Sequence, residues 1–355
     1  MSSTALTNKH TGKATEGTRL GWVDYARGLA ILLVIFRHTM VGLRRSGIMV
    51  SDNLYYIQEF LLNVRMPVFF ILSGVFLGRT LQKRSLRSIA ANKTANLLYP
   101  YLVWSVILIT FQIVLSNYTN SQRSWTDYKY ILYQPRELDH MWYLLALFNT
   151  TMLFLVCYNA LKRQPLLHFI LAVVLYYFHY LVYDYSLVSD IMYNYVFLVF
   201  GVYMYERIAR MENLDLKKLG LLFIITVPVF IAGQLFWLNH INDHYQPLRT
   251  IYLLPFLAII FVASLVYYLV SRILYELQVA KFLAWIGKYS LYIYIVHVFV
   301  IAMVRVGFVK FLHIENQYVL ILSSLVLGII IPVLFHKLLV KLNIKYLFSF
   351  NKSGK

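Results

Sequence analysis

The sequence predicts an all-α polytopic membrane protein with about ten transmembrane helices and with both the N- and the C-terminus in the cytoplasm. Three observations support this fold class. Of the 355 residues 60% are hydrophobic and only 14% are charged, long apolar segments recur along the chain, and basic residues collect in alternate loops. A soluble domain has about 25% charged residues and at most half apolar ones. The excess of apolar side chains must therefore face lipid.

Each predicted helix is an apolar segment of about 20 residues, which is the length that crosses the hydrocarbon core of a bilayer. Some segments contain a proline, which a membrane helix tolerates where neighbouring groups satisfy the freed carbonyl. The sixth segment is short and the least well defined. The ten segments are 21–43, 60–80, 95–116, 141–161, 165–183, 191–206, 218–238, 249–271, 282–305 and 318–340.

The loops between these segments predict their orientation, because cytoplasmic loops carry an excess of Lys and Arg. Basic residues follow the second, fourth, sixth, eighth and tenth segments, whereas loop 117–140 balances bases with acids and loop 184–190 contains acids and no base. We therefore expect a multi-pass protein of the plasma (inner) membrane. It would have a cytoplasmic tail at 1–19, a transmembrane domain at 20–341 and a cytoplasmic tail at 342–355.

The net charge of +18 does not indicate nucleic-acid binding, because it is spread over short loops rather than gathered on one soluble face. The single cysteine, Cys157, lies in an apolar segment. It allows no intramolecular disulfide and no zinc site built from thiolates. We predict neither a bound metal nor a permanently bound cofactor.

The first segment is apolar enough to span a membrane, yet it carries Asp24, Arg27, Arg37 and His38. Charged groups inside a bilayer are costly and usually mark function. Arg27 and His38 are eleven residues apart, so they share nearly the same helix face at a separation of roughly 16 Å. Either the two side chains serve opposite ends of an extended substrate, or this helix is bent.

These side chains have distinct candidate roles. His38 suits a general base, because an imidazole exchanges a proton near neutral pH. The alternative is a histidine capped by a neighbouring backbone carbonyl. Arg27 would position a substrate or stabilise an oxyanion. Asp24 precedes it by three residues, a spacing that favours an ion pair and lowers the cost of burying the arginine.

The second candidate element is the segment 65–78, RMPVFFILSGVFLG. Ser73 and Gly74 at its centre suit close helix packing and a hydrogen bond to a neighbouring helix. Arg65 beside a membrane proline fits two interpretations equally well. It would bind a phosphate or carboxylate group, or its side chain would reach to the membrane interface.

Three further segments contain candidate binding residues. In 137–144 (ELDHMWYL), Glu137, Asp139 and His140, followed by Trp142, would meet a polar substrate from outside, unless this is an ordinary polar loop before an interfacial tryptophan. In 176–185 (YYFHYLVYDY), the aromatic residues favour an interfacial belt over a stacking platform for a sugar.

The third of these segments is 285–297 (WIGKYSLYIYIVH), in which Ser290, Tyr294 and His297 share one helix face. Two helical turns separate Ser290 from His297, which is too far for a catalytic Ser–His pair. We therefore interpret these residues as packing or substrate-orienting groups.

Four of these segments resemble, in the same order, the signature segments of the acyltransferase-3 family of membrane O-acyltransferases. DYARGLAILLVIFRH resembles the family's first helix, in which a base, ten residues and a histidine correspond to Arg27 and His38. MPVFFILSG resembles its second-helix signature, HMWYLLALF its fourth and GKYSLYIYIVH its late Ser…His segment. The resemblance covers about residues 19 to 340 and is closest to the stand-alone, fucose-4-O-acetylase-like group without a soluble esterase-like domain.

One position departs from the family pattern. The family often has two arginines three residues apart before an LLPPY-like sequence, whereas Lys93 and Asn96 precede LLYPY here. We therefore assign contacts with the donor's phosphates to Lys93 together with Arg84 and Arg87, in a basic rim suited to phosphate groups. The same rim suits anionic lipid headgroups equally well, or it only sets the topology.

The resemblance implies an integral membrane O-acyltransferase with acetyl as the expected acyl group. It would move that group from cytoplasmic acyl-CoA, acetyl-CoA in the simplest case, to a hydroxyl of a cell-surface glycan or its lipid-linked precursor. His38 would act as the base or carry the acyl group covalently. The alternative is a non-enzymatic transporter or exporter of a glycan or small anion, which the proline-containing helices and intramembrane charges also fit. The sequence shows no paired half-repeats, which disfavours this alternative.

Overall fold

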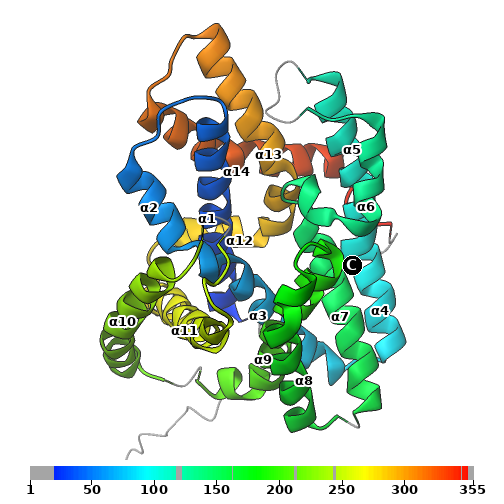
Figure 1. The fold of residues 1–355 in the computed structure, drawn as a ribbon, viewed down its shortest axis with the longest axis vertical. Helices are drawn as coiled ribbons and strands as arrows, with labels where there is room; N and C mark the ends of the chain where they lie inside the picture. The colour runs from blue at the N-terminus through cyan, green and yellow to red at the C-terminus, as the bar shows by residue number, and fades with distance from the viewer. Residues whose placement is uncertain are drawn as a thin grey trace, which may run out of the picture.

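The computed structural model describes residues 20–116, 122–161, 163–211, 214–242, 245–344 and 346–350. Ten helical segments in these ranges are long and apolar enough to cross a membrane. The predicted all-α polytopic membrane fold is thereby confirmed (Figure 1). The predicted tail 1–19 and the last five residues of the predicted tail 342–355 lie outside the described residues.

The ten spanning segments combine α-helices with short 3-10 or π-helical turns, which are labelled η. They are α1 (Gly21–Arg45), α2 (Asp52–Phe60) with α3 (Leu62–Leu81), α4 (Leu86–Lys93) with η1 (Thr94–Leu98) and α5 (Tyr99–Val114), α7 (Trp142–Ala160), α8 (Pro165–Phe178) with η4 (His179–Val182), α9 (Ser186–Met211), α10 (Leu216–Asn239), η5 (Thr250–Tyr252) with α11 (Leu253–Glu276), α13 (Ser290–Val306) with η6 (Gly307–Phe311), and α14 (Gln317–Lys341). Shorter elements connect them: η2 (Trp125–Lys129), α6 (Tyr130–Tyr133), η3 (Pro135–Leu138) and α12 (Lys281–Lys288).

α1 is the central element of the bundle, because it contacts α3, α11, α12, α13 and α14 (Figure 1). It runs without a break from Gly21 to Arg45 and buries one apolar stripe that includes Ala30, Ile31 and Val34. We call the side of the bundle where α1 begins the near side and the side where it ends the far side.

Contacts between helix ends fix the direction of the neighbouring helices. On the far side, Arg305 near the end of α13 donates from Nη1 to the Gly42 carbonyl (3.0 Å), and the Ser51 amide donates to the Gln317 side chain at the start of α14 (2.8 Å). α14 therefore ends on the near side, where α1 begins. The two ends of the bundle thus share one side of the membrane, and the loop charges predict that this side is cytoplasmic.

The crossing of α1 and α12 brings the two backbones into direct contact. A Cβ added to Gly287 would lie 1.8 Å from the Asp24 carbonyl oxygen, and one added to Gly28 would lie 2.1 Å from the Leu283 carbonyl oxygen. No side chain larger than hydrogen fits at such distances. The crossing therefore fixes the near-side end of α1, which carries Arg27.

α3 and α9 pack in the same way. A Cβ added to Gly74 would lie 2.3 Å from the Leu198 carbonyl oxygen, and one added to Gly201 would lie 2.1 Å from the Ile71 carbonyl oxygen. Small residues allow membrane helices to approach this closely. The close packing predicted around Gly74 is therefore present.

Several segments differ from their predicted bounds. The third begins at Leu86 rather than at residue 95, so Lys93 lies within a continuous helical segment. The ninth is interrupted at Tyr289, which separates α12 from α13. The prediction that the sixth is short was wrong, because α9 has 26 residues. Asp190 interrupts the apolar pattern of α9 but belongs to the helix, where it pairs with Arg136.

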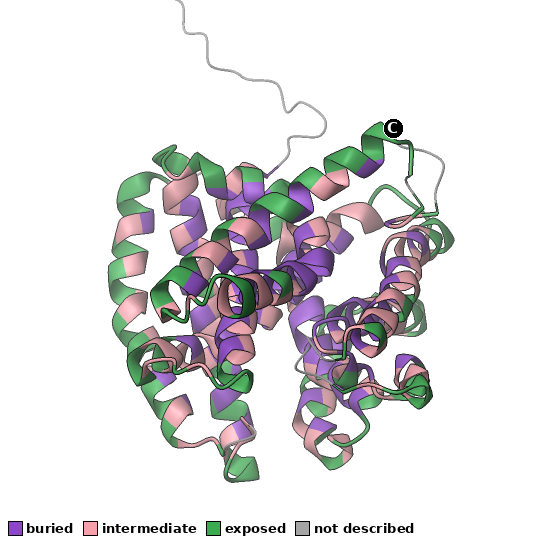
Figure 2. Ribbon diagram, turned by 90° about the horizontal axis from the view of Figure 1, so that it is seen from above, coloured by how far each residue is buried: buried purple, intermediate pink, exposed green. Residues whose placement is uncertain are grey.

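Buried residues gather where the helices meet, and exposed residues lie on the outer helix faces (Figure 2). The exposed positions on α10 are largely apolar and include Leu221, Ile224, Ile225 and Val229. Such a face is unfavourable in water and expected against lipid. α10 is therefore a peripheral helix, and α1 with its neighbours forms the interior.

Candidate active site

Three histidines from distant parts of the sequence meet on the far side of the bundle. His38 lies on α1, His140 in the turn before α7, and His297 on α13. The His38 ring centroid lies 5.2 Å from that of His297 and 6.1 Å from that of His140, and the remaining pair is 5.1 Å apart. The structure thus brings three of the predicted site residues into one cluster.

Backbone carbonyls fix the tautomers of two of these histidines. His297 donates from Nδ1 to the carbonyls of Tyr294 (2.7 Å) and Ile293 (3.1 Å), and His140 donates from Nε2 to the Ile295 carbonyl (3.0 Å). A carbonyl oxygen only accepts, so the second nitrogen of each ring carries a lone pair. Both second nitrogens are buried without a hydrogen-bond partner among the described residues.

His38 makes no hydrogen bond within the described part of the chain, so the alternative of a carbonyl-capped histidine does not describe it. Its ring nitrogens remain available to a substrate. Among the described residues, no three His, Cys, Asp or Glu side chains are arranged to hold a metal ion.

His140 lies just outside the membrane-spanning segments and is only 1% exposed. Burial lowers the pKa of its imidazole from 6.5 to about 4, and the hydrogen bond to Ile295 offsets only part of this shift. The ring is therefore neutral at physiological pH. Its Nδ1 is therefore a hydrogen-bond acceptor that no described residue uses.

His38 faces two cavities. The larger one, which we call the arginine cavity, has a volume of about 350 Å³ and is lined by His38, His140, Asp139, Trp142, Tyr294 and four arginines, Arg37, Arg45, Arg65 and Arg136. The smaller one has a volume of about 100 Å³. Its lining is mainly apolar and includes Leu108, Phe111 and Phe299. A group held at His38 can therefore have a polar part on one side and a small apolar part on the other.

A third cavity of about 400 Å³, which we call the aromatic cavity, adjoins the arginine cavity and shares Arg136, Asp139 and Trp142 with it. Aromatic rings and amide side chains alternate in its lining, which includes Tyr176, Tyr183, Tyr193, Trp237, Tyr245, Asn63, Asn194 and Gln246. Two of these rings belong to the segment 176–185. That segment therefore contributes side chains to a cavity, and its role as an interfacial belt stays a prediction.

Arg27 belongs to a separate cluster on the near side. Its guanidinium lies over the Phe76 ring, with Cζ 4.5 Å from the centroid, and it interacts electrostatically with Lys93 and Tyr143. The Tyr143 hydroxyl hydrogen-bonds with Ser73. Four elements, α1, α3, α4 and α7, therefore bring two cations and two hydroxyls together.

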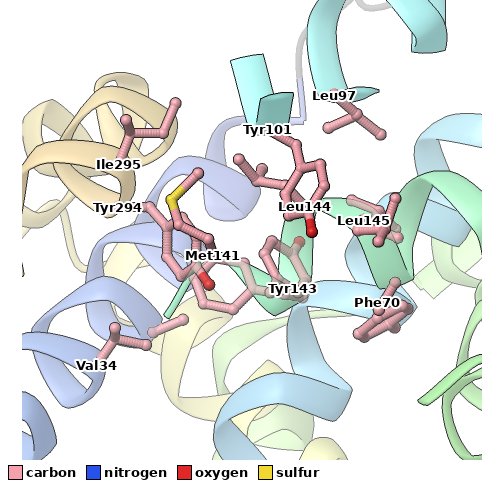
Figure 3. Close-up of a cluster of buried hydrophobic side chains, with 14 of the residues drawn as sticks. Val34, Phe70, Leu97, Tyr101, Met141, Tyr143, Leu144, Leu145, Tyr294 and Ile295 are labelled. Atoms are coloured by element: carbon pink, nitrogen blue, oxygen red, sulfur yellow. The ribbon is translucent and has the colours of Figure 1, made fainter. Parts of the chain in front are cut away.

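Two buried tyrosines lie between the near-side cluster and the histidines. Figure 3 shows both, Tyr143 and Tyr294, within the buried hydrophobic cluster. The Tyr143 ring lies 5.2 Å from the Tyr294 ring, which lies 5.4 Å from the His140 ring. The Tyr294 hydroxyl also donates to the His140 backbone carbonyl. Because α1 is continuous between Arg27 and His38, these two residues lie at opposite ends of this connection and cannot act on one bond.

Some predicted residues lie away from the cavities. The Glu137 side chain is exposed, and Ser290 lines neither cavity that contains His38. Arg84, in the turn before α4, and Arg87, on α4, are exposed, away from the half-buried Lys93. The carboxylate that faces the site is Asp139, because a backbone φ of 51° turns the chain at this residue.

The sequence interpretation gave no role to Arg37, Arg136 or Gln58, which the structure brings to the arginine cavity or against its arginines. Arg37 carried a usable signal, because it is a charge inside a membrane segment. Gln58 carried none, since its importance depends on the two side chains that reach it from other helices.

A comparison with known families agrees with this geometry. A family model described as an acyltransferase domain matches residues 20–337. No curated protein and no solved structure matches the chain significantly. The matched range contains both clusters and the tyrosines between them. The chain therefore belongs to the acyltransferase-3 family and is a membrane acyltransferase.

Proposed function

We propose that this protein is an O-acyltransferase that takes an acyl group, with acetyl as the expected one, from acyl-CoA on the near side and transfers it to a glycan hydroxyl on the far side. One observation carries this proposal: two chemically different clusters occupy opposite ends of the continuous helix α1. Cations gather around Arg27 at one end, and imidazoles gather around His38 at the other. The loop charges predict that the near side is cytoplasmic, where acyl-CoA is found.

The near-side cluster suits the donor. Arg27 and Lys93 offer two positive charges to the phosphates of acyl-CoA, while the extended pantetheine arm would run along α1 toward His38. The two ends of this path are roughly 16 Å apart along the helix axis. Arg27 therefore acts as a positioning residue for the donor. It is too far from His38 to stabilise the reacting carbonyl.

The aromatic cavity suits the acceptor. Sugar rings present apolar faces that stack on aromatic side chains and hydroxyl groups that bond to amides and carboxylates. The cavity offers both, for example the ring of Trp237 and the amide of Asn63. It shares Arg136, Asp139 and Trp142 with the arginine cavity, so a glycan held there would extend one hydroxyl toward His38. The fucose-4-O-acetylase-like subtype remains a prediction.

The small cavity beside His38 favours a short acyl group. Its volume of about 100 Å³ lies between Leu108, Phe111 and Phe299. An acetyl or similar short group fits in such a space. This supports acetyl as the group transferred.

In the proposed reaction the acceptor hydroxyl oxygen attacks the thioester carbonyl carbon while His38 accepts the hydroxyl proton. The carbon–sulfur bond then breaks, and His38 returns the proton to the CoA thiolate. The products are the acylated glycan and CoA with a free thiol. His140 and His297 each have an unpartnered ring nitrogen in the same cluster, and we assign to them the role of orienting the His38 N–H group.

The test uses the full chain in lipid nanodiscs, labelled acetyl-CoA and a panel of oligosaccharides. We expect label transfer by the native protein and a loss of at least about 100-fold in His38→Ala. His313→Ala is the matched control, because His313 is exposed in the loop before α14. Transfer that persists in His38→Ala would show that His38 is not the base. Glycan flux across vesicles without any label transfer would support the transporter alternative.

A further inference from the structure

The arginine cavity contains more positive charge than its own carboxylates neutralise. Among the described residues, four guanidinium groups line it, and Asp139 is the one carboxylate in its lining. Arg136 pairs with Asp190 of α9 (2.7 Å), and Arg45 approaches Asp139 (3.9 Å). These two pairs leave two further guanidiniums in the cavity, those of Arg37 and Arg65.

Arg37 and Arg65 share one neutral partner. Arg37 donates from Nη1 to the Gln58 side-chain oxygen (2.8 Å), and Arg65 donates from Nη2 to the same atom (3.2 Å). Arg65 is only 3% exposed, and no carboxylate in the described part of the chain lies within ion-pair distance of either guanidinium. A buried charge without a counter-charge is strongly unfavourable. Arg37 is half-buried and lies over the Tyr245 ring, with Cζ 5.7 Å from the centroid, so it adds a second positive charge beside the buried Arg65. Together the two guanidiniums point to an anion that the cavity receives from outside.

The two guanidiniums lie beside the proposed base. Arg37 directly precedes His38 on α1, and both Arg37 and Arg65 act electrostatically on the His38 ring. His140, which is buried and has an unpartnered Nδ1, faces the same cavity. An anion bound here would lie within about one sugar unit of the hydroxyl that reacts.

The donor does not supply this anion. In the proposed reaction its phosphates bind near Arg27, roughly 16 Å away along α1. The part of the donor that reaches His38 is the uncharged thioester. The remaining source is the acceptor.

We propose that the acceptor carries an anionic group, a carboxylate or a phosphate, that Arg37 and Arg65 bind next to the hydroxyl acylated at His38. This inference rests on the proposed function and adds the substrate class to it. A planar guanidinium binds both kinds of anion with two parallel hydrogen bonds. The aromatic cavity holds the neighbouring sugar units.

A competing role for the same arginines is stabilisation of the oxyanion that forms on the thioester carbonyl. The two roles predict different kinetics. Loss of an oxyanion contact lowers kcat for every acceptor alike. Loss of an anion subsite raises KM for charged acceptors and leaves neutral acceptors unaffected.

The test compares three matched acceptors in nanodiscs: an oligosaccharide ending in glucuronate, its carboxyl-reduced counterpart ending in glucose, and an oligosaccharide ending in glycerol phosphate. We expect the native protein to prefer one of the charged acceptors, and the better one identifies the anion. Arg37→Gln and Arg65→Gln should raise KM for that acceptor by about tenfold to a hundredfold. Arg44→Gln is the control, because Arg44 is exposed on the same helix and stacks on Tyr55 outside the cavity.

Equal use of all three acceptors by the native protein, with equal losses of kcat in both variants, would overturn the inference in favour of the oxyanion role. Absence of label transfer to every acceptor would instead count against the proposed function. If Arg65→Gln fails to fold, glucuronate and inorganic phosphate provide a second measurement. One of them should raise the Tm of the native protein and not that of Arg37→Gln. If neither anion raises the Tm of the native protein, or if the rise is the same in Arg37→Gln, the result would also contradict the anion site.

Discussion

Replacing Gly287 with alanine should separate two helices that position the donor. The added Cβ would lie 1.8 Å from the Asp24 carbonyl oxygen, so α1 and α12 must move apart by roughly 1.5 Å to restore an ordinary contact. Overpacking of this kind costs about 1–3 kcal/mol. In a chain of this size, that corresponds to a fall in Tm of about 1 to 4 °C. The displacement also moves Arg27, one turn further along α1.

The assay measures Tm in detergent and KM for acetyl-CoA on the same preparation. We expect Gly287→Ala to lower Tm and to raise KM for acetyl-CoA by about tenfold, because a shift of about 1 Å in a positioning group can cost up to 100-fold. Gly220→Ala on α10 is the matched control, since no atom lies within 4 Å of its added Cβ. A Gly287→Ala protein with unchanged Tm and KM would refute the claim that this crossing fixes the donor site.

Three further predictions concern the far side. As pH falls from 6.5 to about 4, His140 becomes protonated in the unfolded chain and stays neutral in the folded chain. The free energy of unfolding of the native protein should therefore fall by about 3 kcal/mol over this range, and that of His140→Asn should not show this loss. Tm measured against pH for both proteins tests this. Asp190→Asn should lower the free energy of unfolding by about 3 kcal/mol, because it leaves the partly buried Arg136 without its counter-charge. The double variant Arg136→Met with Asp190→Leu should recover much of this stability in a thermal unfolding assay. Phe111→Ala should admit butyryl-CoA, because Phe111 lines both the small cavity at His38 and an apolar cavity of about 270 Å³ beside it; unchanged selectivity among acyl-CoA donors would contradict this.

The spanning helices could be predicted because the bilayer imposes one segment length on all of them. The predicted bounds failed where a charge lies inside a helix. Asp190 and Lys93 seemed to end apolar segments, yet each belongs to a spanning segment. Asp190 is tolerated there because Arg136 reaches it from a loop 54 residues away in sequence. A count of apolar residues along one segment contains no information about such a partner.

The separation of Arg27 and His38 could also be predicted, because it depends only on the periodicity of one helix. The meeting of His38 with His140 and His297 could not. It requires α13 to pack against α1 and the turn before α7 to reach both helices, which no local pattern encodes. The resemblance singled out each histidine in its own segment, and only the fold joins them.

The choice between Glu137 and Asp139 shows a different limit. Both carboxylates lie in one short polar loop, where neither helical nor strand periodicity indicates a direction. The positive φ of Asp139 turns its side chain into the site, and Glu137 remains exposed. An aspartate adopts this backbone region more readily than a glutamate does. From the sequence, this preference of aspartate indicates only that the chain turns near residue 139. It does not indicate that the Asp139 side chain points into the site.

Because α1 is unbroken, the distance between Arg27 and His38 is fixed, and this distance limits which donors the proposed enzyme can use. A donor bound at Arg27 delivers its thioester to His38 only if its arm matches the spacing of eleven residues, so thioesters with truncated arms should reach one end or the other and not both. Insertion of one residue between Arg27 and His38 would lengthen this distance by about 1.5 Å and rotate His38 by about 100° about the helix axis. The spacing of Arg27 and His38 thus selects the length of the donor's arm, and the small cavity beside His38 selects the size of the acyl group.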